Sequence, residues 1–66
     1  MVRMKLTLKS ARLVSGLTAD QVASSLGMNI NTVYKYENFK SYPTVDVANK
    51  MAELYGVKFE DLIFFQ

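Results

Sequence analysis

The chain contains neither cysteine nor histidine, and in a protein of 66 residues this absence constrains the fold strongly. A domain of this size buries only roughly 60% of the surface of its unfolded chain, and small domains are often reinforced by disulfides or bound metal ions. Neither a disulfide nor a Cys/His zinc site is available here. The fold must therefore be held by well-packed helices, by self-association, or by both. The sequence predicts one small domain over residues 1–66.

Charge is distributed unevenly along the chain, although the net charge is only +2. Residues 1–40 carry six basic and two acidic side chains, whereas residues 41–66 carry two basic and four acidic ones. A polyanion would therefore favour the N-terminal part, while an ordinary scatter of solvated charges is the alternative interpretation. No apolar run has the length of a signal peptide or of a bilayer span. We expect a cytoplasmic protein without membrane contact.

Glycine residues divide the chain into helix-like segments. Gly16, Gly27 and Gly56 each follow such a segment, where a left-handed residue ends a helix at the least steric cost. No segment alternates apolar and polar residues over a sustained length, so no β-sheet is expected. The predicted fold is all-α. Its five short helices are expected at residues 6–15, 18–26, 30–38, 44–55 and 58–63.

The second and third of these helices carry the signals of a helix-turn-helix. Thr18 and Gln21 have the spacing of a capping box, and Asn29 is a favourable N-cap for the third helix. Ala23 is small enough to let the two helices cross closely, and Gly27 tolerates the positive φ of a tight turn. Residues 18–38 therefore predict a helix-turn-helix, in which the second helix can lie in the DNA major groove.

Nearly the whole chain, from Leu8 to Leu62, resembles the XRE/Cro-repressor family of helix-turn-helix proteins. The resemblance implies a compact, five-helix, lambda-repressor-like DNA-binding domain. It further implies a sequence-specific transcriptional regulator, a repressor that binds a double-stranded DNA operator as a homodimer. The residues that carry the resemblance include Gly16-Leu17-Thr18, Val22-Ala23, Leu26-Gly27-Met28, Thr32-Val33, Tyr36-Glu37-Asn38, Pro43-Thr44 and Tyr55-Gly56-Val57.

The outward face of the third helix is the candidate DNA-reading surface. If Val33, Tyr36 and Glu37 turn inward, helical spacing places Asn31, Tyr34, Lys35 and Asn38 outward. An asparagine can bond an adenine edge in a bidentate way, and a lysine can reach guanine acceptors or a phosphate. Solvated surface residues are the alternative interpretation. The resemblance implies base contacts by Ile30, Asn31, Tyr34 and Lys35, and candidate phosphate contacts are Thr18, Asn29, Asn38, Lys40 and Ser41.

Two further features of the chain concern the end of the third helix. The resemblance implies a structural ion pair between Arg12 and Glu37, which ties the first helix to this end. Phe39 departs from the family, which commonly has glycine at this position. The helix then ends one residue early, with Asn38 in the left-handed conformation that it tolerates better, or Phe39 packs onto Tyr42. Contact with DNA sugars or with a dimer partner is the functional alternative.

The C-terminal residues Ile63, Phe64 and Phe65 are more apolar than a free tail should be. They either cover the core or form the dimer contact. An enzyme is not expected, because the chain lacks histidine, cysteine and a phosphate-binding glycine loop. Neither a cofactor, a metal nor a small-molecule ligand is expected. A protein-interaction and dimerisation module with weak or vestigial DNA binding, for example one that binds a partner as an antitoxin does, is the alternative function. It is favoured by the modest net charge, by Ala19, where the family often has a phosphate-contacting glutamine, and by Asp20, which would repel phosphate.

Overall fold

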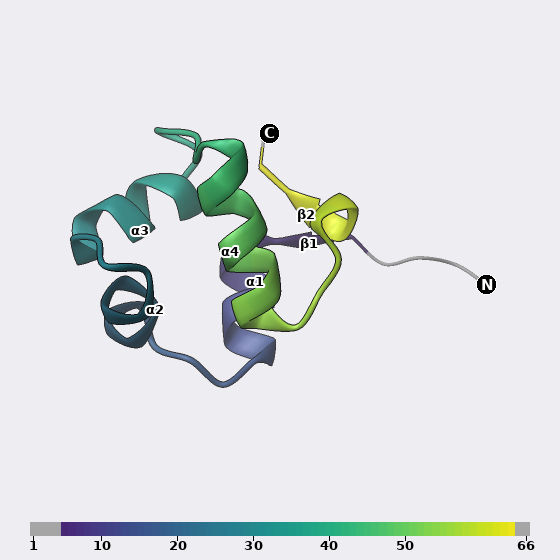
Figure 1. The fold of residues 1–66 in the computed structure, drawn as a ribbon, viewed down its shortest axis with the longest axis horizontal. Helices are drawn as coiled ribbons and strands as arrows, with labels where there is room; N and C mark the ends of the chain where they lie inside the picture. The colour runs from purple at the N-terminus through teal and green to yellow at the C-terminus, as the bar shows by residue number, and fades with distance from the viewer. Residues whose placement is uncertain (1–4, 65–66) are drawn as a thin grey trace.

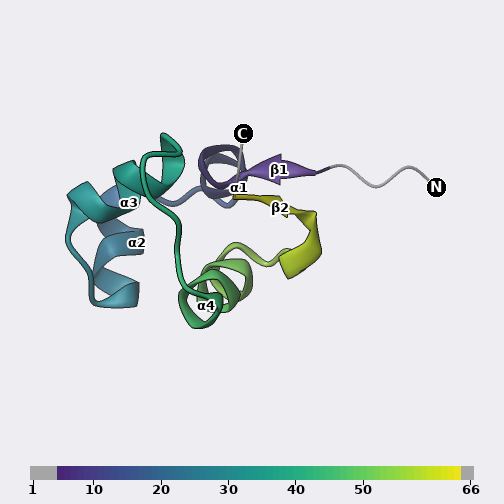
Figure 2. The same cartoon turned by 90° about the horizontal axis from the view of Figure 1, so that it is seen from above.

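The computed structural model describes residues 5–64, which form four α-helices, one 3₁₀ helix and two short strands. Figures 1 and 2 show α2 and α3 together at one end of the molecule, the strands at the other, and α1 and α4 between them. The elements in chain order are β1 (Leu6–Thr7), α1 (Leu8–Val14), α2 (Ala19–Leu26), α3 (Ile30–Glu37), α4 (Val45–Tyr55), the 3₁₀ helix η1 (Phe59–Asp61) and β2 (Leu62–Ile63).

Every α-helix begins at a polar residue whose side chain caps it. The side-chain oxygen of the N-cap accepts a backbone N–H from the first turn and so satisfies a donor that has no partner within the helix. The expected capping box of Thr18 and Gln21 is confirmed. The first helix begins at Leu8, two residues later than expected, because Thr7 is its cap and Leu6 is extended. The four caps are Thr7, Thr18, Asn29 and Thr44.

The four helices also end in the same way. After each helix one residue adopts a positive φ, and the next N–H donates to a carbonyl five residues back, as in a Schellman motif. The left-handed residues are Gly16, Gly27, Phe39 and Gly56, with φ of 75°, 65°, 60° and 69°.

The end of α3 differs from expectation. α3 ends at Glu37, one residue earlier than expected, but Asn38 has a φ of −93° and Phe39 itself takes the left-handed conformation, so the alternative with a left-handed Asn38 is wrong. The hydrogen bonds explain the position of the turn: the N–H of Phe39 donates to the carbonyl of Tyr36 at 3.3 Å, and that of Lys40 to the carbonyl of Lys35 at 2.9 Å. A residue with a Cβ pays about 1–2 kcal/mol for this conformation.

The C-terminal segment is not the expected fifth α-helix, and the expectation of no sheet is also wrong. A 3₁₀ helix of three residues follows Lys58, whose side chain makes no capping bond, and Leu62 after it is extended. β2 then pairs with β1 in a parallel register, with Leu6 opposite Leu62 and Thr7 opposite Ile63. The extended backbone turns Leu62 into the core, where it is only 6% exposed. Pairing also gives backbone groups of this segment partners that an isolated turn would lack.

The core lies where the four α-helices meet. Each helix contributes one large side chain that is almost completely buried: Leu8, Val22, Val33 and Met51. Small residues lie between them, and Leu26, Met28 and Tyr36 pack against the buried cluster from the outside. Within residues 5–64, none of the helices combines the length and apolar character that crossing a membrane requires.

Candidate nucleic-acid interface

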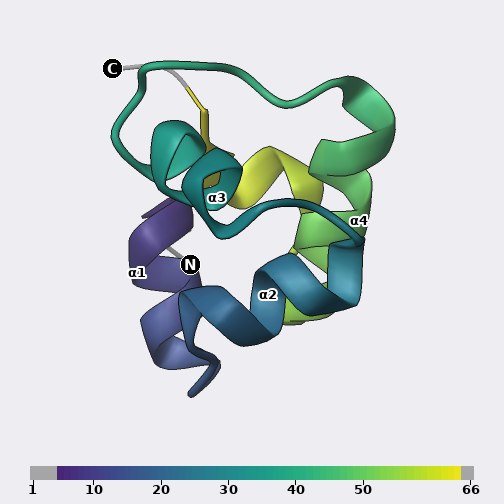
Figure 3. The ribbon, with the colours of Figure 1, turned by 90° about the vertical axis from the view of Figure 1, so that its left-hand side faces the viewer.

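The site is built on α2 and α3, which are joined by a turn of three residues. Gly27 adopts the left-handed conformation, and the N–H of Met28 donates to the carbonyl of Ala23 at 2.9 Å, which closes α2. Ala23 is 4% exposed, and Val33 of α3 is completely buried. Figure 3 shows α3 crossing α2 at one end of the molecule. A small residue, a left-handed glycine and an apolar anchor thus fix how α3 lies on the body of the protein.

Three of the four candidate base-reading side chains are exposed on α3. Asn31 and Lys35 are exposed, and Tyr34 is 44% exposed between them. Ile30 differs, because it is half-buried and packs against the core cluster. Ile30 therefore contributes to anchoring the start of α3, and only its remaining exposed part is open to a ligand. The polar residues form a continuous face opposite Val33.

The candidate phosphate residues at the two helix N-termini already make capping bonds. The hydroxyl of Thr18 accepts the N–H of Gln21 at 3.1 Å, and the N–H of Thr18 donates to Oε1 of Gln21 at 2.8 Å. Oδ1 of Asn29 accepts the N–H of Asn31 at 2.8 Å. The side-chain amide of Asn29 keeps its two N–H donors on Nδ2. Asp20 is exposed in the first turn of α2 and adds a negative charge there.

The remaining phosphate candidates follow α3. Asn38 and Lys40 are exposed, whereas Ser41 is half-buried and its backbone N–H donates to the carbonyl of Lys35 at 3.3 Å. Together with Lys35, Lys40 places two exposed positive charges at the C-terminal end of α3. These charges also complement the negative end of the helix dipole.

Arg12 of α1 and Glu37 of α3 form a buried, two-point ion pair. Nε of Arg12 donates to Oε2 of Glu37 at 2.7 Å, and Nη2 donates to Oε1 at 3.3 Å. Nη1 donates to the carbonyl of Leu17 at 3.1 Å, just before α2. The hydrogen bond to Glu37 raises the pKa of Arg12. The residues are 8% and 7% exposed, so the pair supports the interface from within.

Tyr55 and Ser15 had no predicted role at this site, although Tyr55 is among the residues that carry the family resemblance. Tyr55 of α4 is 6% exposed, and its hydroxyl has no hydrogen-bond partner within residues 5–64. Burial, reinforced by the charge of Glu37, raises the pKa of Tyr55 to about 12. Oγ of Ser15 lies 2.7 Å from the carbonyl oxygen of Ala11 and 3.1 Å from that of Tyr55, and its hydroxyl donates to these carbonyls. The apolar residues Ala48, Met51 and Tyr55 have helical spacing, which is consistent with the burial of Tyr55, but no sequence signal connected Tyr55 with the ion pair.

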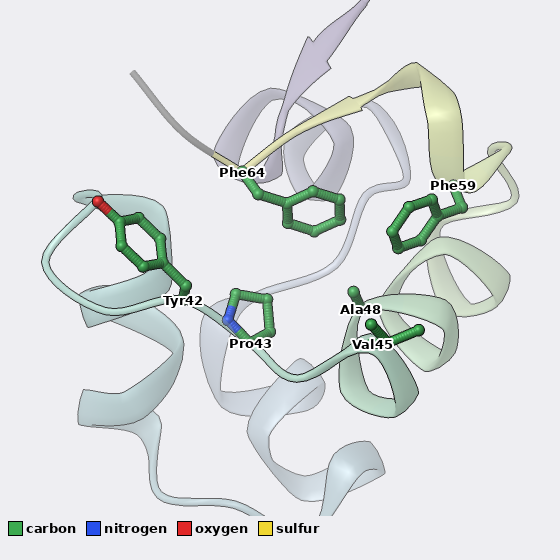
Figure 4. A pocket seen from close by; sticks show the side chains of 6 residues that line it. All are labelled: Tyr42, Pro43, Val45, Ala48, Phe59 and Phe64. Atoms are coloured by element: carbon green, nitrogen blue, oxygen red, sulfur yellow. The ribbon is translucent and has the colours of Figure 1, made fainter.

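An apolar groove lies away from α2, between the N-terminal end of α4 and the C-terminal segment. Figure 4 shows the rings of Phe59 and Phe64 side by side in it, with centroids 5.3 Å apart. Of the candidate dimer residues, Phe64 lines the groove, Ile63 is half-buried in β2, and Phe65 lies outside the described residues. The groove is lined by Tyr42, Pro43, Val45, Ala48, Phe59 and Phe64.

Neither the composition nor the geometry assembles a metal site in the described part of the chain. The sequence has no histidine or cysteine, and nowhere in residues 5–64 do three acidic side chains gather as ligands for an ion. What the α2–α3 unit presents is a row of hydrogen-bond donors, acceptors and positive charges on one helix. Such a face suits recognition of a polar, anionic surface.

Comparison with known proteins decides the family. The family model described as helix-turn-helix matches residues 8–62, which include all four α-helices. The chain belongs to the XRE family of helix-turn-helix proteins. The family places it in the class of DNA-binding transcription regulators.

Two archaeal relatives of this XRE-family chain differ greatly in length. The chain is 35% identical over 63 residues to an uncharacterised HTH-type transcriptional regulator of Methanocaldococcus jannaschii, with 96% of both chains covered. It is 41% identical over 49 residues to an HTH-type transcriptional regulatory protein of Sulfurisphaera tokodaii. That match covers 74% of this chain but only 17% of the relative. No solved structure matches the chain at a significant level.

Proposed function

We propose that the protein is a sequence-specific repressor that binds double-stranded DNA as a homodimer and reads the major groove with α3. The observation that carries the proposal is the contrast between the two faces of α3. Asn31, Tyr34 and Lys35 are exposed on one face, while Val33 and Glu37 are buried on the other. A helix anchored on one side and polar on the other has the character of a major-groove reading helix.

Electrostatics supports an anionic partner for this face. Between Tyr34 and Pro43 the single acidic side chain is Glu37, whose charge is paired with Arg12 inside the protein. The exposed charges of the segment are therefore the positive charges of Lys35 and Lys40. Positive charge along the contact neutralises phosphates and releases counterions, which supplies much of the affinity for DNA.

The homodimer is supported by the apolar groove. Three large apolar or aromatic side chains on its rim are exposed to solvent: Tyr42 by 56%, Val45 by 69% and Phe59 by 39%. Contact with a second copy would remove this apolar surface from water. A two-fold dimer would also place two α3 helices about one DNA turn, roughly 34 Å, apart. Repression then follows from occupation of DNA that the polymerase needs.

The test replaces one base-reading residue and compares it with one phosphate-contacting residue. The probe is the duplex that the wild-type protein selects from a random pool, together with its single-base variants. We expect Asn31→Ala to reduce discrimination at one base position of each half-site by about 1–3 kcal/mol. Lys40→Ala is expected to weaken binding to all duplexes alike and to lower the salt slope by about one.

Asn49→Ala is the matched control, because Asn49 is an exposed asparagine on α4 rather than on α3. It should leave both affinity and discrimination unchanged. If Asn31→Ala binds the selected duplex as tightly as wild type does, the outward face of α3 does not read bases. If the wild-type protein binds no duplex even at low salt, the interaction module becomes the better description of the protein.

A further inference from the structure

The end of α3 differs from the ends of the other three α-helices in the residue that takes the left-handed conformation. All four α-helices end with a residue of positive φ followed by the same backbone hydrogen bond. Three of these residues are glycine, and Phe39 is the single exception within residues 5–64. The hydrogen bonds at this turn are made by backbone atoms alone, so glycine would form them without the steric penalty of a Cβ.

The core does not compensate for this penalty. Phe39 is half-buried, yet its side chain is not among those packed against the core cluster of the described residues. Partly buried side chains elsewhere, such as Leu26 and Tyr36, do pack against that cluster. Backbone strain of this kind clusters at functional positions, among them those that hold a ligand.

The surroundings of Phe39 indicate what the ring contacts. The residues on either side, Asn38 and Lys40, are exposed, and Lys35 lies one turn back on α3. Figure 1 shows that the segment after α3 projects beyond the body of that helix. An apolar ring flanked by a cation and an amide matches the backbone of DNA, in which charged phosphates alternate with the apolar faces of sugars. The two exposed lysines near the ring, Lys35 and Lys40, favour an anionic backbone over an uncharged protein surface as the partner.

We propose that the ring of Phe39 packs on a deoxyribose of the bound duplex, at the edge of the groove that α3 enters. The proposal rests on the proposed function and adds a residue to it. A sugar contact carries no sequence information, so the ring positions α3 on the duplex and raises affinity for every sequence by the same factor. The glycine found at the other helix ends cannot make this contact.

Two substitutions separate the ring from the strain. Phe39→Gly removes both, whereas Phe39→Ala removes the ring and keeps a Cβ in the left-handed conformation. We expect the melting temperature of Phe39→Gly to lie about 4–8 °C above that of Phe39→Ala.

We expect both variants to bind DNA about tenfold more weakly than wild type, which corresponds to about 1.4 kcal/mol. The loss should be the same for the duplex selected by wild type and for a random-sequence duplex. Val14→Ala, at a side chain that is 78% exposed at the end of α1, is the control and should leave binding unchanged.

Each other outcome contradicts the proposal in a recognisable way. If the affinity of Phe39→Gly equals that of wild type on each of the two duplexes, the sugar contact is wrong, and the proposed function is not affected. If sedimentation shows that Phe39→Gly weakens self-association without DNA, the ring belongs to a dimer contact instead. If Phe39→Gly melts well below wild type, the ring supports the fold. If wild type binds neither duplex, both the sugar contact and the proposed function are wrong.

Discussion

Arg12 and Glu37 form a buried charged pair that holds α3 in place. Their two short contacts join α1 to the last turn of α3, and a third donor of Arg12 holds the carbonyl of Leu17 before α2. One guanidinium thus links three segments of the site. Burying two charges costs solvation, so the net stabilisation by the intact pair is small, but the loss of one partner leaves a buried charge without compensation.

We therefore expect Arg12→Ala to lower the free energy of unfolding by about 3 kcal/mol, because Glu37 keeps a charge that is 7% exposed. Thermal unfolding followed by circular dichroism measures the effect. The double variant Arg12→Ala/Glu37→Ala should recover part of the loss, since it removes the uncompensated charge. An unchanged melting curve for Arg12→Ala would exclude the pair from the scaffold.

The burial of Tyr55 predicts that the folded protein loses stability at high pH. Its pKa is about 12 in the folded protein and 10 in the reference state, because burial disfavours the phenolate. The folded state therefore keeps the proton longer than the unfolded state does. The stabilisation is present below pH 10 and is lost as the pH rises toward 12.

Tyr55→Phe should flatten this alkaline decline in the free energy of unfolding. It also removes a buried hydroxyl that has no partner within residues 5–64, so the stability at pH 7 should not fall below that of wild type. Denaturant titrations from pH 7 to pH 12 provide the measurement. Tyr42→Phe, at a side chain that is 56% exposed, is the control. The account of Tyr55 is wrong if both variants decline as steeply as wild type does.

At the scale of elements, the parts that sequence predicted are those determined by neighbouring residues. The capping box at Thr18 and the glycine ends of α2 and α4 act over one turn of helix, so their signals are complete within a few residues. The outward placement of Asn31 and Lys35 followed in the same way from helical periodicity.

The parts that sequence missed depend on distant partners or on competition between two local preferences. β1 and β2 pair through Leu6 and Leu62, and strands of two residues are too short to show alternation. At the end of α3, asparagine tolerates the left-handed conformation better than phenylalanine does, but the backbone hydrogen bonds place the turn at Phe39 rather than at Asn38. The packing of Ile30 against the core cluster was not predicted, and its contact with a base stays a prediction.

The turn between α2 and α3 offers a test of this local control. Gly27 has a φ of 65°, and a Cβ built there meets no atom within 4 Å. The cost of Gly27→Ala is therefore conformational alone, and we expect it to lower the free energy of unfolding by about 1 kcal/mol. Gly27→Asn should lose less, because asparagine tolerates this conformation better. Equal melting temperatures for wild type and Gly27→Ala would show that the turn does not need a left-handed residue.

At the scale of the whole molecule, the charge and apolar patterns separate into two regions. The outward face of α3 and the segment after it carry exposed positive charge, whereas the groove beside α4 is apolar. In the proposed function, the first region contacts DNA and the second contacts another copy of the chain. Packing of four helices and the pairing of β1 with β2 take the place of the disulfides and Cys/His zinc sites that the composition excludes.

The central claim is that the protein recognises a particular DNA sequence through α3. The most direct test compares the affinity of the wild-type protein for the duplex that it selects from a random pool with its affinity for random duplexes at the same salt concentration. We predict that the selected duplex contains two inverted half-sites one DNA turn apart and binds at least about a thousandfold more tightly than random duplexes do. Equal affinity for selected and random duplexes would contradict the claim.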